Sequence, residues 1–182
     1  SLVLLCKYTS RIWKSLGAGA GFLGIQVIYY STSFNLDEAG YGKLINQEII
    51  GVSEIFGYIG GELFISKVAR KKASIFGMTV SGGICILLAV MNVFKEDNED
   101  LVRILGMVGL VINRFVLCCF WSIFYVYIAE LFPTKVRSLA FGWASAVGTT
   151  GSTLSPYIIY FSKSLHIDSW ILPGAIGLLT VP

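Results

Sequence analysis

Two ionisable residues, Glu54 and Arg114, stand near the middle of long apolar runs in this 182-residue chain. Glu54 precedes Ser66 by 12 residues, roughly 18 Å of helix at ~1.5 Å per residue. Arg114 precedes Glu130 by 16 residues, roughly 24 Å at the same rise. In a membrane, a lone charge at such depth costs at least ~2.5–3.5 kcal/mol, so these residues are normally paired and functional. We therefore predict an inter-helix ion pair that faces a central cavity; a purely structural pair is the alternative.

Aromatic side chains accompany both charges. Tyr29 and Tyr30 lie in the outer half of the first apolar run, where aromatic residues often serve as interfacial anchors. Trp121 lies 9 residues before Glu130, too deep for an anchor, and is either core or cavity wall. We assign Tyr30 and Trp121 to the predicted cavity together with the ion pair.

Six apolar runs must position these residues. They span roughly residues 15–36, 44–68, 73–94, 101–132, 138–161 and from 169 onward. Only 14% of residues are charged and the mean hydropathy is +0.73, whereas soluble domains carry about 25% charged residues. Apolar runs of 18 or more residues are typical of transmembrane helices. The chain is predicted to be an all-α, polytopic transmembrane bundle.

It does not begin with methionine and its last apolar run is short, so we expect both ends to be cut.

Charged connections alternate along the chain. Basic residues gather before the first run, between the second and third runs (Lys67, Arg70, Lys71, Lys72), and in the segment ELFPTKVR at 130–137. Pro133 is predicted to end the helix before that segment, which then forms a tight charged turn. Because Lys and Arg accumulate in cytoplasmic loops, these three connections are predicted to be cytoplasmic.

The fifth run contains Gly148, Gly151 and Pro156 among several serines and threonines. A polar segment broken by glycine and proline is tolerated at membrane depth mainly where it is buried or lines a cavity. Close helix packing through the glycines is the alternative.

Several function classes are excluded. The chain has no nucleophile–base set, no glycine-rich phosphate loop after a strand and no cluster of metal ligands, so we expect neither an enzyme nor a cofactor. Membrane topology already explains the short basic runs, so no nucleic-acid partner is expected.

The segment ELFPTKVR resembles the E-L-[YF]-P-T-x-[VI]-R signature that follows the tenth helix of organic cation, anion and carnitine transporters of the major facilitator superfamily. Glu54 matches the acid of that branch's V-E-x-P segment, although Phe56 replaces the proline. Gly151 and Pro156 match its G-x-x-x-x-P. Residues 66–71 resemble its D-R-x-G-R-[RK] turn, with Ser66 in place of the acid.

The resemblance implies that residues 1–182 form the carboxy-terminal half, helices seven to twelve, of a transporter. Its partners would be the lipid bilayer, a small organic solute and a missing amino-terminal six-helix half. The plasma membrane is implied more strongly than an organelle. Gating roles would fall on the cytoplasmic turns, at Lys67, Arg70, Lys71, Glu130 and Arg137.

Thr149 occupies the position, 19 residues after Glu130, that is commonly acidic in cation transporters and basic in anion transporters of this branch. A hydroxyl there leaves the sign of the substrate open. We expect transport of small organic ions or zwitterions by alternating access. A transport-inactive structural subunit of a larger membrane complex is the alternative, favoured by Thr149 and by the degenerate turn at 66–71.

Overall fold

The apolar runs fold as helices because a helix satisfies its own backbone N–H and C=O groups where no water can do so. The computed structural model describes residues 9–35, 42–65, 69–93, 99–165 and 168–181. Within these ranges the six helices are α2 Thr9–Phe34, α3 Lys43–Ile65, α4 Arg70–Val93, α5 Glu99–Leu131, α6 Thr134–Ser164 and α7 Ile171–Leu179. The predicted all-α fold is confirmed.

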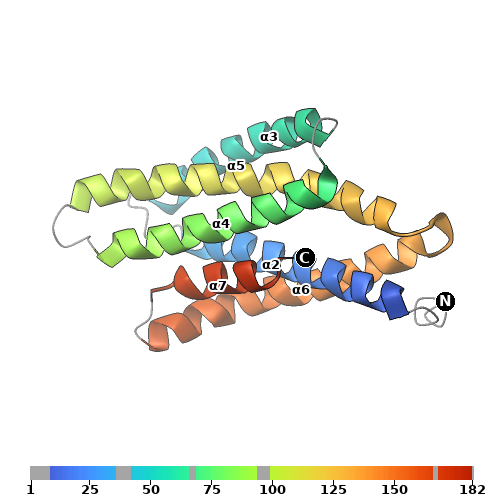
Figure 1. Cartoon of the computed structure of the whole chain (residues 1–182). Helices are drawn as coiled ribbons and strands as arrows, with labels where there is room; N and C mark the ends of the chain where they lie inside the picture. Colours follow the sequence, from blue (N-terminus) through green and yellow to red (C-terminus); the bar gives the residue numbers. More distant parts are fainter. Residues whose placement is uncertain (1–8, 36–41, 66–68, 94–98, 166–167, 182) are drawn as a thin grey trace.

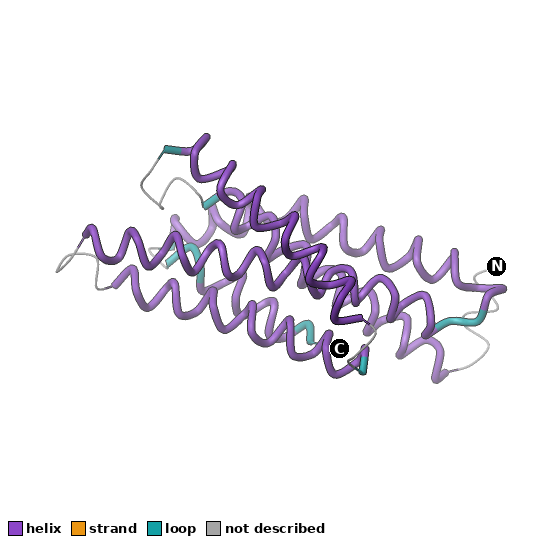
Figure 2. Tube along the Cα trace, turned by 90° about the horizontal axis from the view of Figure 1, so that it is seen from above, coloured by secondary structure: helices purple, strands orange, loops and turns teal. Residues whose placement is uncertain are grey.

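The helices run up and down along one axis (Figure 1). α5 packs against α3 and α4, whereas α2 packs mainly against α6 and α7. Contacts of α4 with α7 and of α2 with α5 join the two groups. Seen from above, the helices cross at small angles and form an elongated bundle (Figure 2). The basic starts of α4 and α6 lie at the same end of the bundle as the start of α2 (Figure 1).

The predicted charged turn at 130–137 is wrong in extent. α5 ends at Leu131 and α6 begins at Thr134, so Phe132 and Pro133 alone separate the two helices. Pro133 has φ −63° and ψ 152° and directly precedes α6. Proline suits the start of a helix, where its missing N–H would have no intrahelical partner. Arg70 and Lys71 likewise belong to the first turn of α4 rather than to a loop.

The predicted break in the fifth run is also wrong, because α6 continues through Pro156. Its glycines serve packing instead. A Cβ at Gly151 would lie 2.8 Å from the carbonyl oxygen of Leu23, so α6 and α2 approach closely there. The hydroxyls of Ser31 and Ser155 form a buried hydrogen bond of 2.9 Å between the same two helices. Small residues allow this close approach of membrane helices.

The core of the bundle is apolar, and much of the outer surface is apolar as well. Phe22, Ile28, Met78 and Phe124 are almost fully buried in the main cluster. On the outside, large side chains such as Leu63 (68% exposed) and Phe76 (63% exposed) are uncovered. Large contiguous apolar surfaces mark protein or membrane contacts. Among the described helices, Arg70–Asn92 and Val102–Leu131 have the length and hydropathy of membrane spans.

Glycines also join α3 to α5. A Cβ at Gly61 would lie 2.6 Å from the carbonyl oxygen of Cys119, and one at Gly57 would lie 2.8 Å from that of Phe115. Backbone atoms cannot rotate away as a flexible side chain can. The α3–α5 contact therefore depends on the absence of side chains at these two positions.

We predict that Gly61→Ala lowers the melting temperature of the full-length protein in detergent, because overpacking typically costs ~1–3 kcal/mol. Gly83→Ala is the matched control, since a Cβ at Gly83 meets nothing within 4 Å. Replacing a helical glycine by alanine at such an open site gains roughly 0.5–1 kcal/mol. Equal melting temperatures for the two variants would contradict the proposed close contact.

Candidate functional site

Arg114 and Glu54 form the predicted ion pair. Nε of Arg114 lies 2.7 Å from Oε1 of Glu54, which joins α5 to α3. The Arg114 side chain is 2% exposed and the Glu54 side chain is 21% exposed. The guanidinium is thus enclosed, whereas the carboxylate is partly exposed.

α2 supplies the other partners of the guanidinium. Nη1 of Arg114 donates to the backbone carbonyl of Tyr29 at 2.7 Å and to the Thr32 hydroxyl at 3.1 Å. Nη2 donates to the Ser33 hydroxyl. The charge is therefore satisfied by one carboxylate and three neutral oxygens, which stabilise a buried cation.

Tyr29 connects the two members of the pair. Its ring centroid lies 3.7 Å from Cζ of Arg114, a cation–π geometry. Its hydroxyl donates to Glu54, 3.2 Å from Oε1 and 3.4 Å from Oε2. Three helices, α2, α3 and α5, thus meet at a single polar junction.

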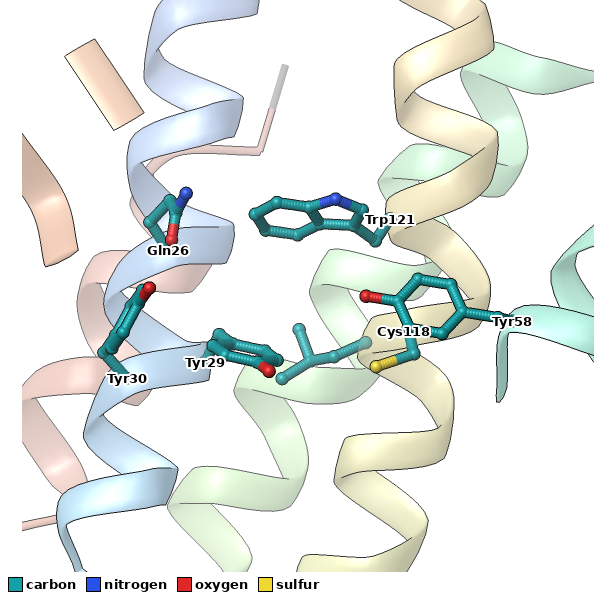
Figure 3. Close-up of a pocket in the computed structure, with 7 residues that line it drawn as sticks. Gln26, Tyr29, Tyr30, Tyr58, Cys118 and Trp121 are labelled. Carbon is teal, nitrogen blue, oxygen red and sulfur yellow. The ribbon is translucent and has the colours of Figure 1, made fainter. Parts of the chain in front are cut away.

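A cavity of about 190 Å³ opens beside this junction. Gln26, Tyr29 and Tyr30 reach it from α2, and Trp121 and Cys118 from α5, with Tyr58 entering from α3 (Figure 3). The Trp121 ring lies 6.1 Å from that of Tyr29, centroid to centroid. Aromatic faces, one amide, one thiol and three hydroxyls therefore surround the space together with Leu117, and Tyr29 links it to Glu54.

Helical spacing brings these residues together. Tyr58 follows Glu54 by four residues, and Cys118 and Trp121 follow Arg114 by four and seven. Residues at these spacings share one face of a helix. The cavity is therefore lined by the turns next to the ion pair on α3 and α5.

A second polar contact lies behind Arg114. Ser81 of α4 donates to Oδ1 of Asn113 at 2.6 Å, and Nδ2 of Asn113 lies 3.6 Å from Sγ of Cys85. All three side chains are 0% exposed. Because Asn113 is adjacent to Arg114 in α5, this link to α4 helps to fix the rotation of α5 about its axis.

At the basic end of the bundle, Arg70 of α4 and Glu130 of α5 form an exposed ion pair. This pair lies far along α5 from Arg114, 16 residues away. It joins the start of α4 to the end of α5, the two helix ends that are predicted to be cytoplasmic and to have a gating role.

The other predicted site residues fall into two groups. Tyr30 and Trp121 line the cavity. Thr149 lies on the exposed face of α6, and its hydroxyl donates to the Ser145 carbonyl at 2.9 Å. Lys71 and Arg137 are exposed near the basic end. Lys67 lies outside the described residues.

Sequence reasoning missed Tyr29, Tyr58, Gln26, Thr32 and Ser33 as parts of the site. One signal could have indicated the α2 residues. Polar residues recur in this segment at a spacing of three or four residues, which places a polar stripe on one face of an apolar helix. The stripe consists of Gln26, Tyr29 or Tyr30, and Ser33. No group of three or more potential metal ligands occurs within the described part of the chain.

Residues 4–166 match the sugar (and other) transporter family. The chain belongs to this family. The match places the chain in the major facilitator superfamily, whose family here is one of membrane transporters and not of enzymes.

Relatives within the family are solute carrier family 22 proteins. The chain is 31% identical to solute carrier family 22 member 16 of Bos taurus over 152 residues, 84% of this chain and 25% of the relative. It is 28% identical to organic cation/carnitine transporter 2 of Homo sapiens over 159 residues, 87% and 27% respectively. Organic cation/carnitine transporter 4 of Arabidopsis thaliana is 28% identical over 153 residues, 84% and 28%. The chain thus spans about a quarter of the length of these relatives.

We predict strong energetic coupling between Glu54 and Arg114. In a double-mutant cycle of Glu54→Gln and Arg114→Gln on the full-length protein, the double variant should be more stable than the sum of the singles by on the order of 1–3 kcal/mol. Each single change leaves a partner without its counter-charge in a poorly hydrated site.

The exposed pair Arg70 and Glu130 provides the control cycle, with Arg70→Gln and Glu130→Gln. Exposed pairs typically couple by ~0.2–1 kcal/mol. Coupling in the Glu54–Arg114 cycle no larger than in this control would show that the central pair is energetically unimportant.

Proposed function

We propose that this chain is the carboxy-terminal six-helix half of a transporter that moves small organic cations or zwitterions by alternating access. The observation that carries the proposal is the unequal burial of the central pair, with Arg114 2% exposed and Glu54 21% exposed. The positive charge is enclosed by α2 and α3, while the less buried carboxylate accepts a hydrogen bond from Tyr29, whose side chain lines the cavity. A solute in the cavity is thus linked through Tyr29 to the negative member of the pair.

The aromatic lining supports a cationic group of the solute. Tyr29, Tyr30, Tyr58 and Trp121 surround the cavity. A ligand cation over the face of such rings gains roughly 0.5–2 kcal/mol, and quaternary ammonium groups are recognised in this way. The carboxylate of Glu54 adds long-range attraction, which a partly dehydrated site strengthens.

Two relatives with the words cation and carnitine in their names point in the same direction. Carnitine carries a quaternary ammonium group, the kind of head group that the cavity suits. The cavity of about 190 Å³ in this half is small for a whole organic solute. A facing half would supply the rest of the site, since facilitator halves rock against each other around a midplane site.

Thr149 belongs to this proposal as a secondary determinant. It lies on the exposed face of α6, where the facing half is expected to pack. With a hydroxyl at this position, the chain lacks the second charge that would favour one sign of substrate. We propose the plasma membrane as the site of transport.

The test is uptake by the full-length protein in cells, with surface biotinylation to measure the amount at the plasma membrane. Radiolabelled tetraethylammonium, carnitine and para-aminohippurate represent a cation, a zwitterion and an anion. Uptake of the cation or the zwitterion above that of the anion supports the proposal. Preferred uptake of the anion contradicts it, and no uptake of any solute despite normal surface expression favours the structural subunit.

We predict that Trp121→Leu raises the KM for the transported cation about threefold to thirtyfold, which corresponds to the loss of ~0.7–2 kcal/mol of aromatic contact. Trp143→Leu is the control, because Trp143 is 44% exposed on α6 and does not line the cavity. Equal KM values for the two variants, measured from concentration series of uptake, would remove Trp121 from the binding site.

A further inference from the structure

A second hollow lies on the opposite side of α5 from the cavity. It measures about 570 Å³, and its lining includes Lys72 and Phe76 of α4 and Phe115, Cys119 and Phe120 of α5. At about 3.6 residues per turn, Val116 and Ile123, which also line this hollow, lie on the face of α5 opposite to Cys118 and Trp121. This hollow is therefore separated from the proposed solute site by the full width of a helix.

The hollow continues toward the other end of the bundle. A neighbouring hollow of about 390 Å³ shares Phe115 and is lined by Val111 and Ile112 of α5 and by Phe56 of α3. α3 and α4 both pack against α5 but make no extensive contact with each other within the described residues. The two hollows thus form one groove with α5 as its floor.

The length of this groove matches one leaflet of a bilayer. Val111 and Ile123, which line its two ends on α5, are 12 residues apart, or roughly 18 Å of helix. Half of the hydrocarbon core measures ~15 Å. A single extended acyl chain therefore has the length of the groove.

The charged part of the groove lining lies at one end of the groove. Lys72 is the charged residue among the described lining residues of the two hollows, and it lies in the first turn of α4. Lys71 beside it is exposed as well. The nearby Glu130 is paired with Arg70, so it does not neutralise these lysines. Glu62 lies four residues after Tyr58, on the cavity side of α3.

We propose that this groove binds an anionic phospholipid of the leaflet that faces the basic end of the bundle. One acyl chain lies along α5 between α3 and α4, and the negatively charged head group meets Lys72. An apolar trough of leaflet length with a cation at its mouth is complementary to such a lipid. A zwitterionic lipid has the same chains but lacks the net charge that Lys72 attracts.

The experiment is native mass spectrometry of the full-length protein in detergent. The delipidated protein is offered dioleoyl phosphatidylserine or dioleoyl phosphatidylcholine, which differ in head group alone. Retention of one phosphatidylserine per protein above phosphatidylcholine is expected. Lys72→Gln should weaken this retention about fivefold, because one basic residue near an anionic head group contributes about 1 kcal/mol.

Two further variants make the result specific. Lys14→Gln removes an exposed charge of α2, at the same end but away from the groove, and should leave retention unchanged. Val116→Trp fills the groove and should lower the retention of both lipids. Equal loss in Lys72→Gln and Lys14→Gln would overturn the proposal, as would equal retention of the two lipids.

Two other occupants would also be detected. If the protein retains a sterol and Val116→Trp displaces it, the groove binds a sterol and the proposal is overturned. If the protein is a dimer and Val116→Trp dissociates it, the groove binds a second copy of the chain and the proposal is also overturned. Because the readout is lipid mass and not uptake, its outcome is independent of the solute that is transported.

Discussion

A buried guanidinium fixes the arrangement of three helices in this bundle. Removing a charge from water costs several kcal/mol even after the protein relaxes. Arg114 is stable at its depth because α3 brings a carboxylate and α2 brings a carbonyl and two hydroxyls to it. A slip of α2 or α3 by one residue would turn these groups away, since successive residues on a helix are about 100° apart. The ion pair therefore sets the register of α2 and α3 on α5, and the glycine contacts of α3 allow the close approach that this register needs.

The same interaction gives the site its polarity. An isolated ion pair with both members equally exposed would attract neither sign of solute. Here α2 satisfies the arginine, which leaves the carboxylate as the more exposed member of the pair, hydrogen-bonded to Tyr29 of the cavity wall. Tyr29 is central to this imbalance because its ring covers the guanidinium while its hydroxyl holds Glu54. A structural role of the pair is thus compatible with the recognition role proposed for Glu54, because enclosing the arginine leaves the carboxylate as the more exposed member.

Much of the fold could be predicted from the sequence, because apolar run length and the placement of basic residues report directly on membrane helices. The pairing of Glu54 with Arg114 could be predicted for a similar reason, since two opposite charges at matching depth have few other partners. Tyr29 could not be distinguished from Tyr30, because neighbouring tyrosines differ only in which face of α2 they occupy, and that depends on the rotation of the packed helix. The expected break at Pro156 failed because a proline inside a long, well-packed helix removes one hydrogen bond without ending the helix. Thr149 was placed by resemblance alone, and its position on the exposed face of α6 depends on how that helix packs.

The two faces of α5 explain how solute and lipid could influence one another. One face carries Cys118 and Trp121 into the polar cavity, and the opposite face carries Val116 and Ile123 into the apolar groove. A helix moves as a rigid rod over this distance, so a rotation or tilt that reshapes one hollow must also reshape the other. A lipid with unequal affinity for two positions of α5 shifts their populations, and a solute with unequal affinity does the same. Thermodynamic reciprocity then requires that each changes the affinity for the other by an equal factor. The link needs no chain of side-chain contacts, because α5 itself is the common wall.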